Sequence, residues 1–408
     1  MKPLAPVVLF AFNRYDHLQV TLQTLAQCEL AEQSSILVYL DGPKTSADAA
    51  IQRQIVEYIN SVNSFLSVEI VHRESNIGLA DNIVSGLDEV MRRYGKAIVL
   101  EDDILVSSCF LRYMNDALEY YQDEPRVWHI SGWNFPIESE GEPPFFLWHT
   151  VLGWGWATWS DRWKYFTREP QKRLEKWRNQ DIQRFNIYGT YDFWEQVQRN
   201  ATGKIKTWAV FWACTVFENN GLCLNPAKSM TTNIGFDGSG THCKGNEFGV
   251  SPAYSGYSTV QCLPQNLTVD CQALDAVIEY TKAKNEARQD QLKHLSTALK
   301  RLMQRYAEKR LAISRLNGRR VAIFGTADIS TIIATILKNQ GVNIIAYLVS
   351  DAQDISAIKG LPVVPMTDWA AYFPEIIINC IEGKHYLSVS QTINKILPDV
   401  DVVYWQEL

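Results

Sequence analysis

The sequence lacks the features of a membrane-spanning or repetitive protein. No apolar run approaches the roughly 18 residues needed to cross a bilayer. The apolar opening segment, residues 4–12, contains Pro6 and precedes no small-residue cleavage site, so we expect a first β-strand there and not a signal peptide. The chain also has no internal repeat and no low-complexity tract. With 46% hydrophobic and 21% charged residues, it has the composition of a soluble globular protein.

Two further absences narrow the classes of function. None of the eight cysteines belongs to a C-x-x-C pair, so neither a zinc ribbon nor a redox motif is present. A chain of this length needs no disulfides to fold, and we interpret the cysteines as mostly reduced thiols in a cytoplasmic protein. The formal net charge of −6 lacks the basic excess of nucleic-acid-binding proteins, so no nucleic-acid partner is expected.

The first 125 residues alternate between strand and helix patterns. Helical spacing places Ile51, Ile55 and Ile59 on one face of a predicted helix. Strands that alternate with helices of this length form βαβ units, so we predict an α/β fold with a mostly parallel sheet. Apolar runs typical of buried parallel strands cover residues 7–12, 36–40, 68–72 and 96–100.

The amino-acid composition and the residue pattern change near residue 271. Leu295, Leu299 and Leu302 recur at helical spacing in a stretch without proline or glycine, which predicts a long helical connector over 271–317. Residues 282–320 contain twelve Lys or Arg and three Asp or Glu, a local net charge of +9. Such a helix either packs the two domains together, the interpretation we favour slightly, or lies on anionic lipid at the inner face of the membrane.

A small second α/β domain is predicted over 318–408, after a first domain over 1–270. Residues 321–330 and the motif Gly360-Leu361-Pro362-Val363 are similar to the Rossmann-like module at the N-terminus of some bacterial sugar-modifying enzymes. A dinucleotide fingerprint requires glycine where Ala327 and Ser330 stand, and only Gly325 remains, so we favour a structural or partner-binding role for this domain. Its predicted strands are residues 321–324, 344–349, 376–379 and 402–405.

Polar residues follow each of the first four predicted strands. Arg14 comes after the first strand, Asp41 after the second, and Asn76 after the third. The fourth strand leads directly into Glu101-Asp102-Asp103. Ligands of open α/β sheets bind outside the carboxyl ends of the strands, so these side chains mark the predicted ligand site.

The acidic triplet at residues 101–103 is the strongest local signal. Three adjacent carboxylates repel one another unless a cation binds among them. Carboxylate oxygens suit Mg²⁺ or Mn²⁺, with phosphate oxygens completing the coordination shell. The alternative is a solvated acidic loop, but the position directly after a buried strand favours the metal site.

Several motifs together resemble a known family. Their order and spacing are similar to those of nucleotide-diphospho-sugar transferases of the GT-A fold, namely the family 2-like bacterial glycosyltransferases and, more distantly, N-acetylglucosaminyltransferase I. The resemblance covers about residues 4–245. The motifs that carry it are residues 7–14, Tyr39-Leu40-Asp41-Gly42, Asn76-Ile77-Gly78-Leu79, Glu101-Asp102-Asp103, Gly153-Trp154-Gly155-Trp156 and residues 233–242.

The resemblance implies how a nucleotide would be bound. Arg14 and the backbone near Phe12 would lie against the nucleotide, and Asp41 would meet its base. Asn76 and Gly78 would shape the nucleotide pocket. Taken singly, Arg14 at a helix start and Asp41 in a turn have ordinary structural explanations, but the combination favours a binding site.

The resemblance also implies the roles of the acidic triplet. Asp102 and Asp103 would form the metal motif, with Asp103 as the direct ligand, and Glu101 would face the ribose or the sugar. His242 lies on a glycine-rich loop that closes over the donor in the relatives. The implied cofactor is Mn²⁺ or Mg²⁺, and the implied donor is a nucleotide-diphosphate sugar.

The sequence departs from the family where the general base is expected. Inverting relatives carry an aspartate in a tryptophan-rich stretch, but Ala209 or Val210 occupies that position here. We predict that Asp192 serves as the base because its aromatic neighbours could desolvate it, with Asp237 as the second choice. The alternative for Asp192 is a helix N-cap. Weaker candidates are Glu195 and Asp161.

Eleven of the thirteen tryptophans lie between residues 128 and 212. We expect about two-thirds of these eleven in the core and Trp133, Trp154 and Trp156 at an acceptor site, because aromatic faces pack against sugar rings. The predicted function is sugar transfer to a glycan or lipid-linked glycan hydroxyl in surface polysaccharide or lipopolysaccharide synthesis. The alternatives are a sugar nucleotidyltransferase and a non-catalytic glycan-binding or scaffold protein.

Overall fold

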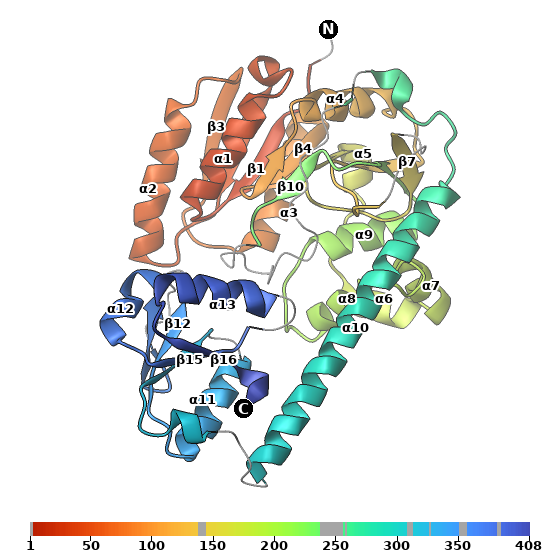
Figure 1. Ribbon diagram of the computed structural model, residues 1–408. Helices are drawn as coiled ribbons and strands as arrows, with labels where there is room; N and C mark the ends of the chain where they lie inside the picture. Colours follow the sequence, from red (N-terminus) through yellow and green to blue (C-terminus); the bar gives the residue numbers. More distant parts are fainter. Residues whose placement is uncertain are drawn as a thin grey trace. The chain divides into compact units, whose positions relative to one another are not determined.

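The computed structural model contains two compact units, Met1–Asn285 and Glu286–Leu408 (Figure 1). Each unit has its own β-sheet and its own hydrophobic core. No helix within the described part of the chain is long and apolar enough to cross a membrane. The structure describes residues 3–137, 144–236, 256–257, 259–307, 313–325, 328–350, 357–381 and 385–408.

The first unit is built around an eight-stranded sheet. Its strands are β1 (Val7–Ala11), β2 (Ser35–Leu40), β3 (Ser67–His72), β4 (Lys96–Glu101), β6 (Val127–Ser131), β7 (Phe145–Trp148), β8 (Trp156–Trp159) and β9 (Leu222–Pro226). They are ordered β3-β2-β1-β4-β8-β6-β9-β7, and β3, β2, β1 and β4 are mutually parallel. Only β8 and β7 run antiparallel to their neighbours. The predicted α/β fold with a mostly parallel sheet is therefore confirmed.

Helices cover both faces of this sheet. Val7 and Leu9 of β1 pack in one core with α1 (Tyr15–Ala26), α2 (Ser46–Ser61) and α4 (Phe110–Tyr120). Val8 and Phe10 point to the other face, where α3 (Leu79–Tyr94) packs. This alternation follows from the two-residue period of a strand, and burial on both faces explains why β1 is continuously apolar.

The tryptophan-rich region forms a layer beside α3 and is mostly core. Ten of its eleven tryptophans are buried, and only Trp154 is partly exposed. The prediction that Trp156 faces an acceptor is wrong, because its ring is 1% exposed and stacks on Trp208 and His129. The helices of this layer are α5 (Ser160–Trp163), α6 (Pro170–Lys176), α7 (Asn179–Phe185), α8 (Trp194–Ala201) and α9 (Ala209–Glu218).

One helix, α10 (Cys271–Ala307), runs through the boundary between the two units. Its first part belongs to the first unit, where Val277 is fully buried and Thr281 donates a hydrogen bond to the hydroxyl of Thr190 at 2.7 Å. Its last part belongs to the second unit, where Leu302 is buried in the core. The helix therefore contributes to both cores.

The second unit has a six-stranded sheet in the order β13-β14-β12-β11-β15-β16. All neighbours are parallel except β13, which is antiparallel to β14. Gly325 follows β11 with a φ of 102°, a backbone conformation that favours glycine, and Ala327 lies outside the described residues. The elements are β11 (Val321–Phe324), α11 (Asp328–Asn339), β12 (Ile344–Val349), β13 (Ala357–Ile358), β14 (Leu361–Pro365), α12 (Trp369–Tyr372), β15 (Ile376–Asn379), α13 (His385–Ile396) and β16 (Asp401–Tyr404).

Candidate functional site

The carboxyl ends of three neighbouring strands place the predicted site residues together. β1 lies between β2 and β4, with Ala11 opposite Leu40 and Phe10 opposite Glu101. The segments that follow these strands therefore start side by side at one edge of the sheet. This is the edge at which open α/β sheets bind ligands.

Arg14 and two aspartates form the centre of the site. Asp102 and Asp103 are 3% and 7% exposed, and both are paired with Arg14. Arg14 Nη1 lies 3.0 Å from Asp103 Oδ2, and Arg14 Nη2 contacts Asp102 Oδ1. The hydroxyl of Thr21 in α1 donates to the backbone carbonyl of Asp102 at 2.8 Å, which fixes the turn after β4.

The site has more negative than positive charge. Burial raises the pKa of Glu101 to about 8, and the neighbouring charges of Asp103 and Asp102 contribute to this shift. Burial also raises the pKa of Asp102, although the positive charge of Arg14 opposes this shift. A pKa of about 8 leaves Glu101 largely protonated near pH 7, so the excess negative charge comes from Asp102 and Asp103 against the single guanidinium of Arg14. A bound cation would be stabilised here.

A second strand pair brings the chain back against Asp103. β10 (Thr231–Asn233) pairs with β5 (Ile104–Val106), and Ile234 N then donates to Asp103 O at 2.9 Å. At Gly235 a Cβ atom would lie 2.2 Å from Asp103 Oδ2, so any larger residue there would displace the Asp103 carboxylate from this position. The candidates Asp237 and His242 on the following loop lie outside the described residues.

The aspartate pair suits a divalent cation. In the ranges that the structure describes, no three His, Cys, Asp or Glu side chains are arranged to hold a metal. However, Mg²⁺ is usually held by only one or two carboxylates together with substrate phosphates. Asp102 and Asp103 offer buried carboxylate oxygens for this purpose, and a cation would replace Arg14 on at least one of them.

Asp41 organises the loop that follows β3. Its Oδ1 accepts hydrogen bonds from the backbone N–H groups of Gly42 and Ile77, each at 2.9 Å. Its Oδ2 accepts from Gly78 N at 2.9 Å and from Asn76 Nδ2 at 3.0 Å. The two oxygens are thus engaged by the protein, so Asp41 shapes the loop at Asn76 and Gly78 through direct bonds.

Gln52 is a site residue that the sequence analysis missed. It is 1% exposed, and its Nε2 donates to Phe12 O at 3.0 Å and to Asp41 O at 2.8 Å. It thereby ties together the ends of β1 and β2. The available signal was its position in α2, three residues before Ile55 and so on the apolar face of the helix.

Asp192 lies at the start of α8 and is exposed. Its Oδ1 accepts from Glu195 N at 3.0 Å and from Asn186 Nδ2 at 2.9 Å, which are contacts of a residue that caps a helix. Glu195 is also exposed, and Asp161 is paired with the buried Arg162. None of these contacts tests a catalytic role, so Asp192 as base stays a prediction.

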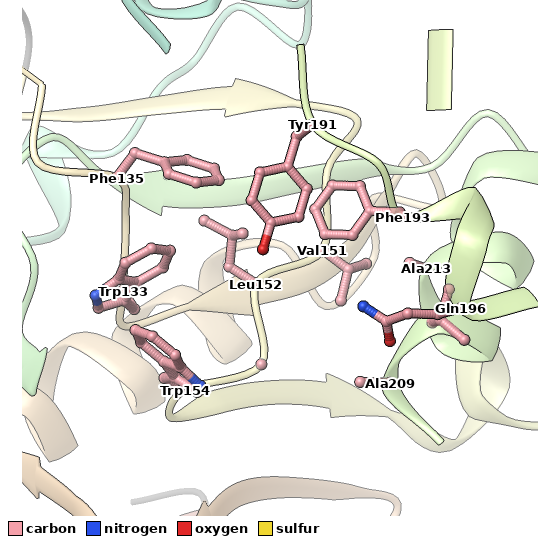
Figure 2. A pocket seen from close by; sticks show the side chains of 12 residues that line it. Trp133, Phe135, Val151, Leu152, Trp154, Tyr191, Phe193, Gln196, Ala209 and Ala213 are labelled. Atoms are coloured by element: carbon pink, nitrogen blue, oxygen red, sulfur yellow. The ribbon is translucent and has the colours of Figure 1, made fainter. Parts of the chain in front are cut away.

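An aromatic pocket of about 150 Å³ lies in the tryptophan-rich layer (Figure 2). Ala209 and Val210, one of which occupies the position of the expected general base, are both lining residues. Ring contacts link the pocket to the segment that follows β10, since Trp154 lies 4.4 Å from Trp133 and 5.4 Å from Phe236 between ring centroids. Its lining residues are Trp133, Phe135, Val151, Leu152, Gly153, Trp154, Tyr191, Phe193, Gln196, Ala209, Val210 and Ala213.

The N-terminal region of the chain is similar to one known family. Residues 1–172 match the GNT-I family. This region contains Arg14, Asp41 and the acidic triplet, so it includes the described centre of the site. The match spans less than half of the chain and makes its N-terminal region similar to that family. No curated protein matches the chain.

Solved structures show only weak likeness. The crystal structure of S. aureus TarS has a TM-score of 0.24 at 16% identity, covering 31% of this chain and 21% of that one, so this chain spans about a fifth of its length. Residues 1–349 of TarS give 0.33 at 9% identity, covering 57% and 61%. The mannosyltransferase PcManGT from Pyrobaculum calidifontis, in complex with GDP-Man and Mn²⁺, gives 0.30 at 11% identity, covering 53% and 69%. These low scores carry no functional argument.

Proposed function

We propose that the chain is a glycosyltransferase that moves a sugar from a nucleotide-diphosphate donor to a glycan hydroxyl. The observation that carries this proposal is the pair of buried carboxylates, Asp102 and Asp103, beside Arg14 at the carboxyl end of β4. The similarity of residues 1–172 to the GNT-I family supports it. The acceptor belongs, in this proposal, to surface polysaccharide or lipopolysaccharide synthesis.

Each residue of the site would have its own role in the proposed reaction. Asp103 and Asp102 would hold Mn²⁺ or Mg²⁺, which supplies positive charge against the departing diphosphate. Arg14 would turn from the carboxylates toward the phosphates, and Glu101 would face the ribose or the sugar. Asp41 would keep the loop at residues 76–78 in the shape that receives the nucleotide, through the four hydrogen bonds described above.

A donor screen tests the proposal. The full chain is incubated with Mn²⁺ and a panel of nucleotide sugars, and thermal stabilisation and slow donor hydrolysis are measured. We expect one donor to raise the melting temperature only when Mn²⁺ is present, because a ligand that binds the folded state stabilises it. A panel in which no nucleotide sugar has a metal-dependent effect would contradict the proposal.

A non-catalytic glycan-binding protein is the second candidate function. The observation in its favour is that the position of the expected base is held by Ala209 or Val210, and both of these apolar residues line the aromatic pocket. The same donor screen separates the two candidates. Stabilisation by neutral glycans, with neither donor binding nor hydrolysis, would favour the binding protein.

The substitution Asp192→Asn tests the predicted base. The amide oxygen of the new side chain can still accept from Glu195 N, so the helix start and the stability should be retained. A positioned general base contributes roughly 10²- to 10⁴-fold, so sugar transfer should fall by about that factor while donor affinity is unchanged. Transfer within a few-fold of the unchanged protein would exclude Asp192 and direct attention to Asp237.

A further inference from the structure

A groove of about 280 Å³ lies between the last part of α10 and α11 in the second unit (Figure 1). α10 and α11 form its walls, and the turn between β13 and β14 contributes a lysine. All of the lining residues belong to the second unit, so the groove is not part of the site at the aspartate pair. The lining residues are Met303, Thr331, Ile332, Thr335, Ile336 and Lys359.

The apolar walls of this groove are exposed. Met303 is 58% exposed and Ile332 is 37% exposed, whereas their neighbours Leu302 and Ile333 are buried in the core of this unit. Leu292 is also exposed and lies about three helical turns before Met303, on the same flank of α10. The residues that the structure describes thus leave an apolar strip uncovered. Adjacent exposed apolar side chains of this kind mark interaction surfaces.

Basic side chains accompany this apolar strip. Lys300 lies one helical turn before Met303, and Lys293 follows Leu292 directly in the chain. Both lysines are exposed, and neither forms an ion pair with a described residue. Residues 291–307 contain no Asp or Glu, so no side chain of this part of α10 neutralises them. The strip therefore combines apolar surface with uncompensated positive charge.

The lysine in the turn between β13 and β14 opposes the local preference of the backbone. Lys359 and Gly360 form a two-residue loop with φ values of 47° and 77°, the positive values of a type I′ hairpin turn. Asn, Asp or Gly is preferred at the first position of such a turn. Lys359 Nζ donates to Thr335 Oγ1 of α11 at 3.2 Å, which uses one of its three N–H groups. A lysine kept in this position indicates a role for its charge at the groove.

The composition of the groove favours lipid over protein as the partner. Protein interfaces are enriched in aromatic residues and Arg and depleted in Lys. The lining contains no aromatic residue and no Arg, and its one charged residue is Lys359. Anionic lipid suits lysines beside an apolar strip, because ammonium groups meet headgroup phosphates while apolar side chains enter the acyl boundary. The long stems of the lysines can lie along the apolar surface meanwhile.

We infer that the second unit docks on an anionic lipid surface through the groove between α10 and α11. Met303 and Ile332 would meet the acyl chains. Lys300 and Lys359 would meet the headgroup phosphates. The inference goes beyond the proposed sugar transfer and does not depend on it. It is compatible with the packing of α10 in both cores, because the groove uses only an exposed flank of the helix.

Flotation of the full chain with vesicles tests the inference. The vesicles consist of phosphatidylcholine alone or of equal parts phosphatidylcholine and phosphatidylglycerol. We expect flotation only with the anionic vesicles and release by salt, since the Debye length falls from about 10 Å at 0.1 M to about 3 Å at 1 M ionic strength. Equal flotation with both kinds of vesicle would overturn the inference. Absence of flotation would exclude lipid and leave an acidic protein segment as the occupant.

Three substitutions locate the contact. Each basic side chain near an anionic surface accounts for about fivefold in affinity, so Lys300→Gln combined with Lys359→Asn should weaken vesicle binding about 25-fold. Met303→Gln should weaken it about tenfold, because an amide replaces apolar surface that enters the membrane. Lys359→Asn alone should melt at the same temperature as the unchanged protein or higher, because asparagine is preferred in this turn. Weaker binding by this variant is therefore not a consequence of unfolding.

Lys395→Gln is the matched control. Lys395 is an exposed lysine on α13, which packs on the opposite face of the six-stranded sheet from α11. This variant should bind anionic vesicles as the unchanged protein does. If Lys395→Gln and Lys300→Gln lose binding equally, net charge is responsible and the groove is not the site. A dimer in vesicle-free solution that Met303→Gln dissociates would assign the groove to a second copy of the chain and refute lipid docking.

Discussion

Asp103→Ala should remove metal-dependent binding of a nucleoside diphosphate while the fold is retained. Loss of even an outer-shell partner of a metal site costs about 10–100-fold in affinity, so loss of a direct ligand should cost at least roughly 100-fold. The fold should survive because Ile234 bonds to the backbone carbonyl of Asp103, and because Arg14 keeps its partner Asp102. Titration calorimetry of nucleoside diphosphate with Mn²⁺ measures the effect directly.

The matched control is Asp123→Ala. Asp123 is an exposed carboxylate that lies near Lys96, at the other end of β4, so its removal should leave nucleotide binding unchanged. With a chelator present, the Asp103 variant and the unchanged protein should bind the nucleotide equally weakly. Mn²⁺-dependent binding of similar strength in both proteins would refute the metal site at Asp103.

The second large effect that we expect is a loss of stability of the first unit as the pH falls. His129 is completely buried, and burial lowers its pKa to about 3. Trp212 Nε1 donates to His129 Nδ1 at 3.2 Å, so Nε2 carries the proton that it donates to Leu152 O. This neutral form has no place for a second proton, whereas the unfolded chain binds one below its ordinary pKa of about 6.5.

The sign of the effect follows from proton counting. Below pH ~6.5 the unfolded state binds one more proton at His129 than the folded state, so stability falls as the pH falls. We expect a loss of about 1.4 kcal/mol per pH unit, and up to about 5 kcal/mol in total, before the pH reaches the folded-state pKa. Above pH ~6.5 this contribution is fully present and constant.

Urea unfolding between pH 4 and 7 would measure this contribution. Tryptophan fluorescence reports on the first unit, because eleven of the thirteen tryptophans lie there. In His129→Gln the amide can still donate and accept, but it does not titrate, so the slope should decrease by about 1.4 kcal/mol per pH unit. His149→Gln is the comparison and should decrease the slope less, because burial also lowers the pKa of His149 but this side chain is only partly buried. An unchanged slope in His129→Gln would show that His129 is not the group responsible.

The strands β1, β2, β3 and β4 were predictable from the sequence, and the other four strands of the sheet were not. β1, β2, β3 and β4 are continuous or alternating apolar runs separated by helices, a pattern that local spacing reveals. β8 is the four-residue segment Trp156–Trp159, and its membership in the sheet depends on pairing with Lys96 to Val99, about sixty residues earlier in the chain. Nothing in its local composition distinguishes this strand from the aromatic helices that follow it.

The site was predictable as a location but not as a set of contacts. Arg14, Asp41 and Asp103 could be assigned to one edge because each follows a strand of a parallel sheet. Which side chain bonds to which depends on strand register and loop conformation, which one-dimensional spacing does not specify. The pairing of Arg14 with both aspartates and the role of Gln52 therefore emerge only from the three-dimensional structure.

Helix α10 has a consequence for how the chain can be divided. A cut after residue 270, where the composition changes, would leave the first unit without Val277, Thr281 and Asn285. The loop at Thr190 would then lose the hydrogen bonds that Thr281 and Asn285 donate to it. A fragment that is to retain the pocket has to extend to Asn285, and a foreign module joined there would inherit a helix that already belongs to the first core. Either unit can therefore be replaced by another domain only together with part of helix α10.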